Sequence, residues 1–366
     1  MSLLRPFVSR SVALAARSST RAVIAPIFPK SVRWVSQPSN PLYDEKAYPE
    51  GYREHRVEVH EPKHASVDES LVFEDPEPNA YAKADPGHDV IGEGHGRHTK
   101  RTLGSLSMEG KVCVVTGAAR GLGNMMARTF VESGADAIVL IDLRKEDAEL
   151  AAKDLTDWFV EHGEAKPGEI RALGLGCDVA NEQSVKDTFA AIKEKFGRLD
   201  CLVTAAGIVE NFVAHEYPTE KVRKLLDINV MGTWTCALEG AKLMPEGGSI
   251  IMIGSMSGSV VNVPQPQTPY NFSKAAVRHM ARSLAVEWAK QNIRVNCIAP
   301  GYTLTNLTKV ILDNNPVLRD EWIHRIPMGR MADPSDLKGA IVLLASDASK
   351  YITGAELVID GGYTCI

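Results

Sequence analysis

Seven apolar, strand-like runs alternate with segments of helical period over residues 108–366 of this 366-residue chain. The strand-like runs cover 111–116, 137–142, 170–176, 200–204, 248–254, 293–299 and 356–360. The helix-period segments cover 121–134, 145–162, 181–197, 219–243, 269–291 and 334–347. Such an alternation predicts a single doubly wound α/β domain, in which helices cover both faces of a seven-stranded parallel sheet. The stretch is long enough to bury one large core.

A glycine-rich turn follows the first predicted strand and opens the first predicted helix. Glycines allow a tight turn and a close approach of the backbone to phosphate. The start of the helix offers free N–H groups and the positive end of a dipole. We therefore predict that the pyrophosphate of a dinucleotide binds here, against Thr116, Gly117, Arg120, Gly121, Leu122 and Gly123.

The second predicted strand ends in an acid, Asp142, nineteen residues after Gly123. A carboxylate at this distance can accept hydrogen bonds from the adenosine ribose hydroxyls. It would repel a 2′-phosphate, because two like charges about 4 Å apart cost roughly 4 kcal/mol at an effective dielectric of 20. Arg120 and Arg144 act in the opposite direction, since either could reach such a phosphate. We predict NAD as the cofactor, with NADP as the alternative.

Tyr270 and Lys274 lie four residues apart in a segment of helical period, so both side chains fall on one helix face. A phenol titrates at about pH 10, and an ammonium group beside it favours the phenolate. Ser255, fifteen residues before the tyrosine, supplies a hydroxyl that could orient a substrate oxygen. The three residues predict an acid–base site. Taken alone, the spacing is more typical of an amphipathic helix with an exposed lysine and a half-buried tyrosine.

Together, the glycine turn, Asp142 and the Tyr-xxx-Lys spacing resemble the short-chain dehydrogenase/reductase family over essentially all of residues 108–366. The resemblance implies a Rossmann-type sheet and hydride transfer between a nicotinamide and a carbonyl or alcohol carbon. It also implies a catalytic tetrad of Asn229, Ser255, Tyr270 and Lys274, with Ser257 as the second candidate for the serine. The family's motifs imply further cofactor contacts from Asp178, Val179, Ala206, Gly207, Tyr270, Lys274, Pro300, Gly301, Thr303 and Thr305.

The resemblance implies one role for each member of the tetrad. Tyr270 exchanges a proton with the substrate oxygen, which Ser255 holds. Lys274 lowers the pKa of the tyrosine and binds the nicotinamide ribose, and Asn229 supports a water that relays protons to solvent. One motif departs from the family. Where Asn-Asn-Ala-Gly is usual, this chain has Thr204-Ala205-Ala206-Gly207, which predicts weaker hydrogen bonding of the sheet at that turn.

Within the family, the segments 255–265 and 360–364 are most similar to fungal polyol and ketose enzymes of the arabinitol 2-dehydrogenase, sorbose reductase and mannitol 2-dehydrogenase types. This similarity implies a sugar alcohol or 2-ketose as the substrate. Two alternatives are an NADP(H)-dependent 3-oxoacyl thioester reductase of mitochondrial fatty-acid synthesis and a regulatory subunit that binds a dinucleotide without catalysis. The polar candidates for substrate contact, each also compatible with an ordinary loop position, are Glu210, Asn211, Asn262, Gln265 and Trp322.

The first 43 residues contain arginines and serines but no acid. This composition is typical of a mitochondrial transit peptide, so we predict one over 1–36 and a location in the mitochondrial matrix; a basic tail is the alternative. Residues 37–107 are rich in Pro, Glu and His, which predicts an extended arm. The histidines at 95 and 98 match no familiar ligand spacing, and we predict no metal site.

The composition also bears on partners. A net charge of −5 without a basic stripe gives no reason to expect nucleic acid. No uncharged apolar run approaches the roughly 20 residues that span a bilayer, so we predict no membrane segment. Six scattered cysteines without a CxxC pair predict buried, reduced thiols. Members of the family are commonly dimers or tetramers, and we expect a homo-oligomer by this analogy alone.

Overall fold

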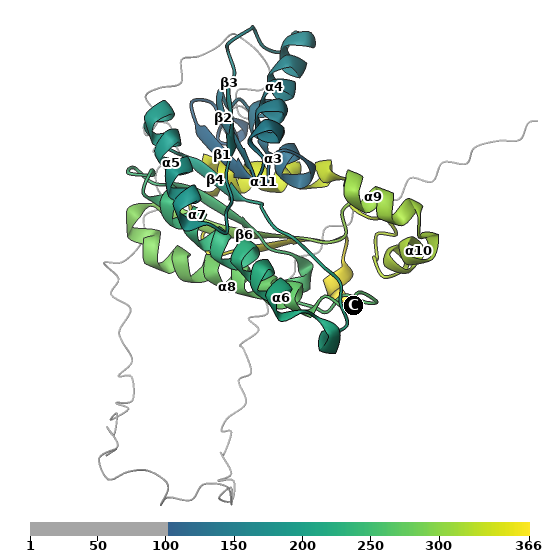
Figure 1. Ribbon diagram of the computed structural model, residues 1–366. Helices are drawn as coiled ribbons and strands as arrows, with labels where there is room; N and C mark the ends of the chain where they lie inside the picture. Colours follow the sequence, from purple (N-terminus) through teal and green to yellow (C-terminus); the bar gives the residue numbers. More distant parts are fainter. Residues whose placement is uncertain (1–101) are drawn as a thin grey trace, which may run out of the picture. The chain divides into compact units, whose positions relative to one another are not determined.

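The computed structural model describes residues 102–366 of the chain. Seven strands form one sheet in the order β3-β2-β1-β4-β5-β6-β7 (Figure 1). All six pairings are parallel, which confirms the predicted doubly wound architecture. Each predicted strand boundary lies within one residue of the observed one. The strands are β1 (Val112–Thr116), β2 (Ala137–Asp142), β3 (Arg171–Gly176), β4 (Cys201–Thr204), β5 (Gly248–Ile253), β6 (Ile293–Pro300) and β7 (Glu356–Ile359).

Helices cover both faces of the sheet because alternate residues of each strand point to opposite sides. In β1, Cys113 and Val115 pack into the apolar cluster of one face, and Val114 packs into that of the other. The first face is covered by α3 (Gly121–Glu132), α4 (Lys145–Glu161) and α11 (Lys338–Ala345). The second is covered by α5 (Glu182–Phe196), α7 (Thr233–Ala241) and α8 (Thr268–Trp288). Both faces of the sheet are therefore buried, as the near-continuous apolar runs require.

Two parts of the helical prediction are wrong in detail. The segment 219–243 is not one helix, because the π-helical turn η3 (Asp227–Gly232) separates α6 (Thr219–Leu226) from α7. Two helices that were not predicted, α9 (Asn306–Asp313) and α10 (Pro316–His324), follow β6 and lie together at one end of the sheet (Figure 1). Both differences contribute to the site described below.

The strand order places a crevice at the carboxyl edge of the sheet. β1 pairs with β2 on one side and with β4 on the other, so the connections leave β1 in opposite directions. Ligands of doubly wound sheets bind at the carboxyl ends of the strands where this reversal occurs. The glycine-rich turn follows β1 directly and therefore lies at this point.

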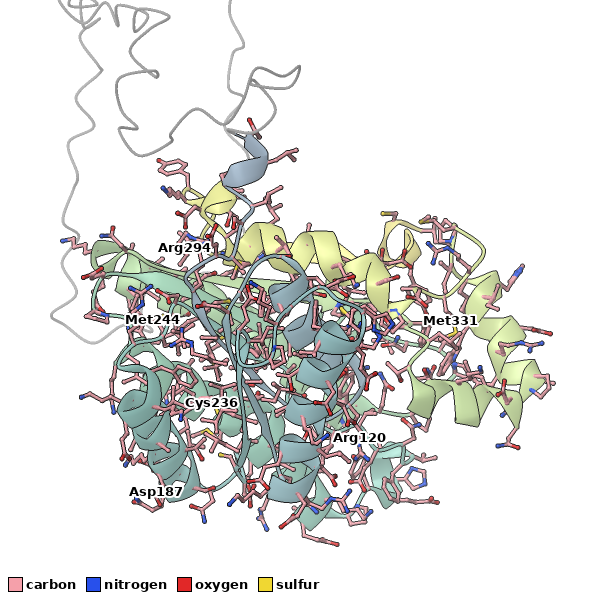
Figure 2. The ribbon with its side chains drawn as sticks, turned by 90° about the horizontal axis from the view of Figure 1, so that it is seen from above. Arg120, Asp187, Cys236, Met244, Arg294 and Met331 are labelled. Atoms are coloured by element: carbon pink, nitrogen blue, oxygen red, sulfur yellow. The ribbon has the colours of Figure 1, made fainter. Side chains whose placement is uncertain are left out.

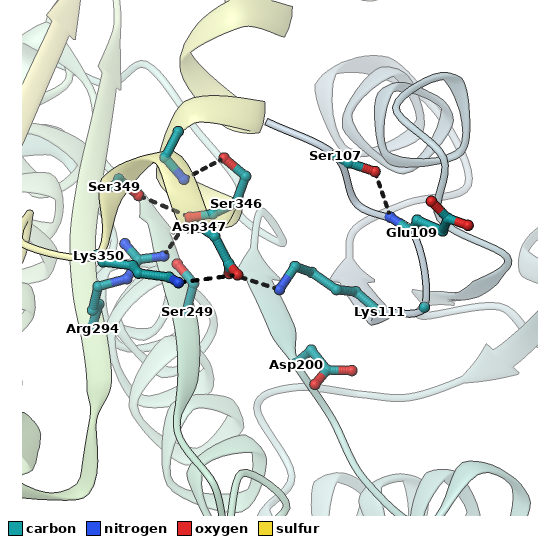
Figure 3. Close-up of polar contacts among 12 residues, drawn as sticks. Ser107, Glu109, Lys111, Asp200, Ser249, Arg294, Ser346, Asp347, Ser349 and Lys350 are labelled. Carbon is teal, nitrogen blue, oxygen red and sulfur yellow. Dashed lines mark hydrogen bonds and ion pairs between the residues drawn. The ribbon is translucent and has the colours of Figure 1, made fainter. Parts of the chain in front are cut away.

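The opposite, amino-terminal edge of the sheet is held by ion pairs and hydrogen bonds (Figure 3). Lys111 Nζ, just before β1, lies 2.9 Å from Asp347 Oδ1. Arg294 Nη2, from β6, donates to the carbonyl oxygen of Leu344 near the end of α11 at 2.8 Å. These contacts connect β1 and β6 to the end of α11, away from the crevice.

Some predictions lie outside the described residues. These are the transit peptide at 1–36, the arm at 37–107 except for its last six residues, and the histidines at 95 and 98. Where the description begins, the Ser105 carbonyl oxygen accepts a hydrogen bond from Ala348 N at 2.9 Å, and Met108 is fully buried. Over 102–366, no helix combines the length and apolar character needed to cross a bilayer, and no three His, Cys, Asp or Glu side chains are grouped as metal ligands would be.

Candidate active site

Two adjoining cavities occupy the crevice. The first, of about 500 Å³, extends from the glycine turn to the ends of β2 and β3. The second, of about 330 Å³, lies over the ends of β5 and β6 and the start of α8. Residues from the glycine turn, the end of β4 and the loop after β6 line both cavities, which makes them continuous. The shared residues are Leu122, Ala205, Gly207, Ile208 and Thr305.

The glycine turn has the backbone that a phosphate site needs. Gly117 has a φ of 67°, in the left-handed region that favours glycine. A Cβ at Gly123 would lie 2.2 Å from the Gly117 carbonyl oxygen, so only glycine allows this close packing. Arg120 precedes α3 (Figure 2), and no side chain caps the helix start, whose N–H groups remain available to an anion. The turn therefore fits a dinucleotide pyrophosphate.

Asp142, the last residue of β2, lines the first cavity. Its Oδ2 accepts from Ala119 N at 3.0 Å and its Oδ1 accepts from Leu143 N at 2.8 Å, so the carboxylate is fixed against the glycine turn. Arg120 and Arg144 line the same cavity, and Arg144 pairs with Asp147. The remaining capacity of the fixed carboxylate oxygens fits two ribose hydroxyls.

Most of the other predicted cofactor residues line one of the two cavities, and one of them instead holds two strand ends together. Gly117, Gly121, Gly123, Asp178, Val179 and Ala206 line the first cavity, and Pro300, Gly301 and Thr303 line the second. Thr116 lines neither. Its hydroxyl accepts from Ala206 N at 3.2 Å and so connects the ends of β1 and β4. The expectation of weaker hydrogen bonding at this turn stays a prediction. The Thr204 backbone is in register with both neighbouring strands, but its buried hydroxyl has no hydrogen-bond partner among the described residues.

Tyr270 and Lys274 both line the second cavity from the first turns of α8, together with Ser255 from the end of β5. Lys274 Nζ lies 5.6 Å from the centroid of the tyrosine ring and donates to the Ile253 carbonyl oxygen at 2.8 Å. The Oγ atoms of Ser255 and Ser257 lie 3.0 Å apart. One phenol, one ammonium and two hydroxyls thus converge on one space.

The pKa values of this pair are governed by burial. Burial raises the pKa of Tyr270, and the Ser255 hydroxyl, its hydrogen-bond partner, lowers it by a smaller amount. Burial also lowers the pKa of Lys274 to about 8, against a smaller opposing effect of the Cys297 thiol. The lowering of the tyrosine pKa by Lys274 stays a prediction; in this structure, loss of solvation is the largest effect on both groups, and the ammonium donates to a backbone carbonyl.

Asn229 is fully buried in the π turn and lines neither cavity. Its Oδ1 accepts from Ile208 N at 2.8 Å, and its Nδ2 donates to the Ile208 carbonyl oxygen at 2.9 Å and to Ser273 Oγ at 3.2 Å. Both amide hydrogens are thus used within the protein. The side chain fixes the turn after β4 against α8, and the predicted water relay stays a prediction.

The structure separates the predicted substrate residues into two groups. Asn262, Gln265 and Trp322 line the second cavity. Glu210 and Asn211 line neither cavity. Glu210 pairs with Lys221 at 2.8 Å, and Asn211 is exposed.

Sequence reasoning missed further residues that line the second cavity. The most prominent are Gln267 and Tyr302. The signal for Tyr302 was its place within the Pro-Gly motif after β6. Gln267 belongs to no motif of the sequence, and its partners Ser257, Asn262 and Asn271 come together only when the loop before α8 folds.

Comparisons with known proteins place the chain among enzymes that share its fold and its sequence motifs. The family model described as enoyl-(acyl carrier protein) reductase matches residues 117–364. The chain is 43% identical over 270 residues to a ribulose-forming D-arabinitol 2-dehydrogenase of Candida tropicalis, covering 71% of this chain and 95% of that one. It is 39% identical over 267 residues to an NADH-dependent L-xylulose reductase of Ambrosiozyma monospora, covering 71% and 97%.

Solved structures are similar over the same part of the chain. A short-chain type dehydrogenase/reductase from Mycobacterium marinum is 35% identical with a TM-score of 0.66, covering 72% of this chain and 100% of that one. A gluconate 5-dehydrogenase from Burkholderia cenocepacia, solved with NADP and tartrate, is 30% identical with a TM-score of 0.66, covering 72% and 99%.

Proposed function

Because the chain belongs to the short-chain dehydrogenase/reductase family, we propose that this nicotinamide-dependent oxidoreductase uses NAD(H) to interconvert a sugar alcohol and a 2-ketose. The observation that carries the substrate class is the hydrogen-bonding lining of the cavity around Tyr270, in which Lys274 is the one charged side chain among the described residues. The names of two relatives, an arabinitol dehydrogenase and a xylulose reductase, support the same class.

The chemistry follows from the positions of three side chains. When bound, the nicotinamide accepts or returns the hydride of the substrate carbon. Tyr270 takes the hydroxyl proton in oxidation and returns it in reduction, and Ser255 hydrogen-bonds the same substrate oxygen. Lys274 supplies a charge beside the phenol that becomes more effective as ligands displace water from the cavity. Ser257, 3.0 Å from Ser255, orients its hydroxyl.

The lining of the second cavity selects for a neutral substrate. Of the described residues that line it, only Lys274 carries a charge, and its ammonium already donates to a backbone carbonyl. Serine, threonine, amide and phenol groups supply the remaining polar contacts. A carboxylate or phosphate substrate would lose its hydration without a free cation in return, whereas a polyol exchanges water hydrogen bonds for those of the protein.

The fixed carboxylate of Asp142 supports NAD over NADP, because a 2′-phosphate would meet a like charge held by two backbone N–H groups. Arg120 and Arg144 line the same cavity and support the alternative. We expect wild type to show the higher kcat/KM with NAD, and Asp142→Asn to raise kcat/KM for NADP relative to NAD by about tenfold or more. An unchanged ratio in the variant would remove Asp142 from cofactor selection.

The test of the function is a substrate panel on the purified protein with each cofactor. We expect turnover of one or more pentitols or hexitols, and of the matching 2-ketose in the reverse direction. Gluconate and acetoacetyl thioesters serve as charged or acyl comparisons. Preference for the thioester with NADPH would favour the 3-oxoacyl reductase alternative. Tight cofactor binding without turnover of any substrate would favour the non-catalytic alternative.

The acid-free, arginine-rich composition of the first 43 residues supports a mitochondrial location. Fusion of residues 1–36 to a fluorescent protein should direct the fusion to mitochondria, and replacing the arginines of this segment by glutamines should abolish import. Diffuse fluorescence from the unaltered fusion would refute the transit-peptide prediction.

A further inference from the structure

Tyr302 is held in one orientation on the wall of the second cavity. It follows β6 by two residues, and its carbonyl oxygen accepts from Ala332 N at 2.9 Å. Trp322, from α10, stacks on its ring with centroids 4.2 Å apart and planes 8° from parallel. Tyr363 meets the same ring edge-on, with centroids 5.6 Å apart. These contacts fix the ring on both sides and leave it little freedom to turn away.

A chain of buried amides fixes the hydroxyl of Tyr302. Asn262 Nδ2 donates to it at 3.2 Å, and Gln267 Nε2 in turn donates to Asn262 Oδ1 at 3.2 Å. With the Gln265 amide turned so that its oxygen faces the indole, this oxygen accepts from the Tyr302 hydroxyl at 3.0 Å and from Trp322 Nε1 at 3.1 Å. Asn262 and Gln267 are only 3% and 6% exposed, so the inner part of the arrangement is buried, while Gln265 and Tyr302 are half-buried.

The group presented to the cavity is a neutral phenol. Burial raises the pKa of Tyr302 to about 12, and the hydrogen bond donated by Asn262 offsets part of that effect. Because its one proton is donated to Gln265, the preorganised phenol oxygen can accept from a substrate hydroxyl with little loss of conformational entropy. Tyr270 and Ser255 line the same cavity and bind the reacting oxygen, so a ligand held by them meets Tyr302 with a different part of its structure.

We propose that Tyr302 is a specificity-determining residue, which hydrogen-bonds a substrate hydroxyl remote from the reacting carbon. This inference rests on the proposed function and deepens it, because it states which part of a polyol is recognised and which residue of the second cavity recognises it. Loss of the phenol oxygen, or of the matching substrate hydroxyl, leaves a buried polar group without its partner.

The test is a thermodynamic cycle, in which the phenol oxygen of Tyr302 and single hydroxyls of the substrate are removed separately and together. Wild type and Tyr302→Phe are each assayed with the best pentitol or hexitol and with its monodeoxy analogues. We expect Tyr302→Phe to lower kcat/KM for the full polyol by about 10- to 100-fold, mainly through KM. For one deoxy analogue, kcat/KM of wild type should already be lower than for the full polyol by the same factor. With that analogue, Tyr302→Phe should have the same kcat/KM as wild type. An equal loss for the polyol and for every analogue would overturn the proposal.

Matched variants control for folding and for general effects. Tyr351→Phe makes the same change at an exposed tyrosine outside both cavities and should leave all rates unchanged. If Tyr302→Phe fails to fold, Gln265→Met should reproduce the loss for the same substrate hydroxyl, and its failure to do so would equally overturn the proposal. If wild type oxidises no polyol at all, the proposed function itself is wrong, and that outcome appears before any variant is made.

Discussion

At the scale of single residues, the site depends on placing a phenol and an ammonium group where water is scarce. The spacing of Tyr270 and Lys274 predicted their common helix face, and both line one cavity. Their pKa values could not be predicted from the spacing, because burial depends on the packing of β5 and β6 beneath α8. Lys274 is only 7% exposed, and its pKa of about 8 shows the cost of that burial.

This cost predicts a pH dependence of stability. The pKa of Lys274 is lower in the folded state than the usual 10.5, so between pH 8 and 10.5 the unfolded state binds more protons. The free energy of unfolding therefore rises with pH through this window, by about 2–3 kcal/mol between pH 7 and pH 10. The reason is that deprotonation of Lys274 removes the cost of burying its charge. The measurement is urea unfolding of wild type and Lys274→Met across this range.

The difference between the two proteins isolates Lys274 from other groups that titrate above pH 8. We expect the free energy of unfolding of wild type to rise relative to that of Lys274→Met as the pH increases. A difference that stays constant from pH 7 to pH 10 would show that the ammonium is solvated, and the account of the buried pair would be wrong.

At the scale of elements, the π turn η3 gives Asn229 its position. The sequence 219–243 has a continuous helical period, so nothing in it marked the extra residue of the turn. Such turns often occur at functional sites. Here the turn places a carboxamide between the loop after β4 and Ser273 of α8, and so connects the lining of both cavities to α8.

Asn229→Ala should weaken both elements. The change leaves the half-buried N–H and C=O groups of Ile208 without their side-chain partner, which should cost about 1–3 kcal/mol of stability and lower kcat at least tenfold. Asn181→Ala removes a surface amide that caps α5 by accepting from Ser184 N, and it should cost about 1 kcal/mol without affecting kcat. Thermal unfolding and steady-state kinetics measure both effects. Equal losses of stability and of kcat in the two variants would show that Asn229 matters no more than a surface helix cap.

The helices α9 and α10 were not predicted from the sequence, for a different reason. Asn315 and Pro316 form a typical helix start, and the Asn315 side chain accepts from Leu318 N at 3.0 Å. The elements were missed because each is only two turns long. Their importance lies in Trp322 of α10, which lines the second cavity and stacks on Tyr302; its predicted contact with substrate stays a prediction.

At the scale of the whole molecule, patterning alone predicted the sheet, its parallel pairing and its helical layers. Each strand is a short apolar run, and the periodicity of each run and helix is a local property. The polar wall of the second cavity could not be predicted in the same way. Its members Asn262, Gln267, Tyr302 and Trp322 come from three separate segments and meet only in the folded chain.

The burial of the core predicts the reactivity of the thiols. All six cysteines lie among the described residues; five are buried, and Cys365 is exposed. Burial raises the pKa of the Cys113, Cys236 and Cys297 thiols, which suppresses the reactive thiolate. A thiol reagent should therefore label one cysteine rapidly in the native protein and six after unfolding, and Cys365→Ser should abolish the rapid phase. Two or more rapid thiols in the native protein would contradict the packing described here.

The most direct test of the central claim is Tyr270→Phe, assayed with the polyol that wild type oxidises best. This change removes the oxygen that exchanges the proton and leaves the ring on α8. We predict that NADH binding, followed by fluorescence titration, stays within about threefold of wild type, while kcat falls at least 1000-fold. Turnover within tenfold of wild type would show that another group moves the proton, and the acid–base role given to Tyr270 would be wrong.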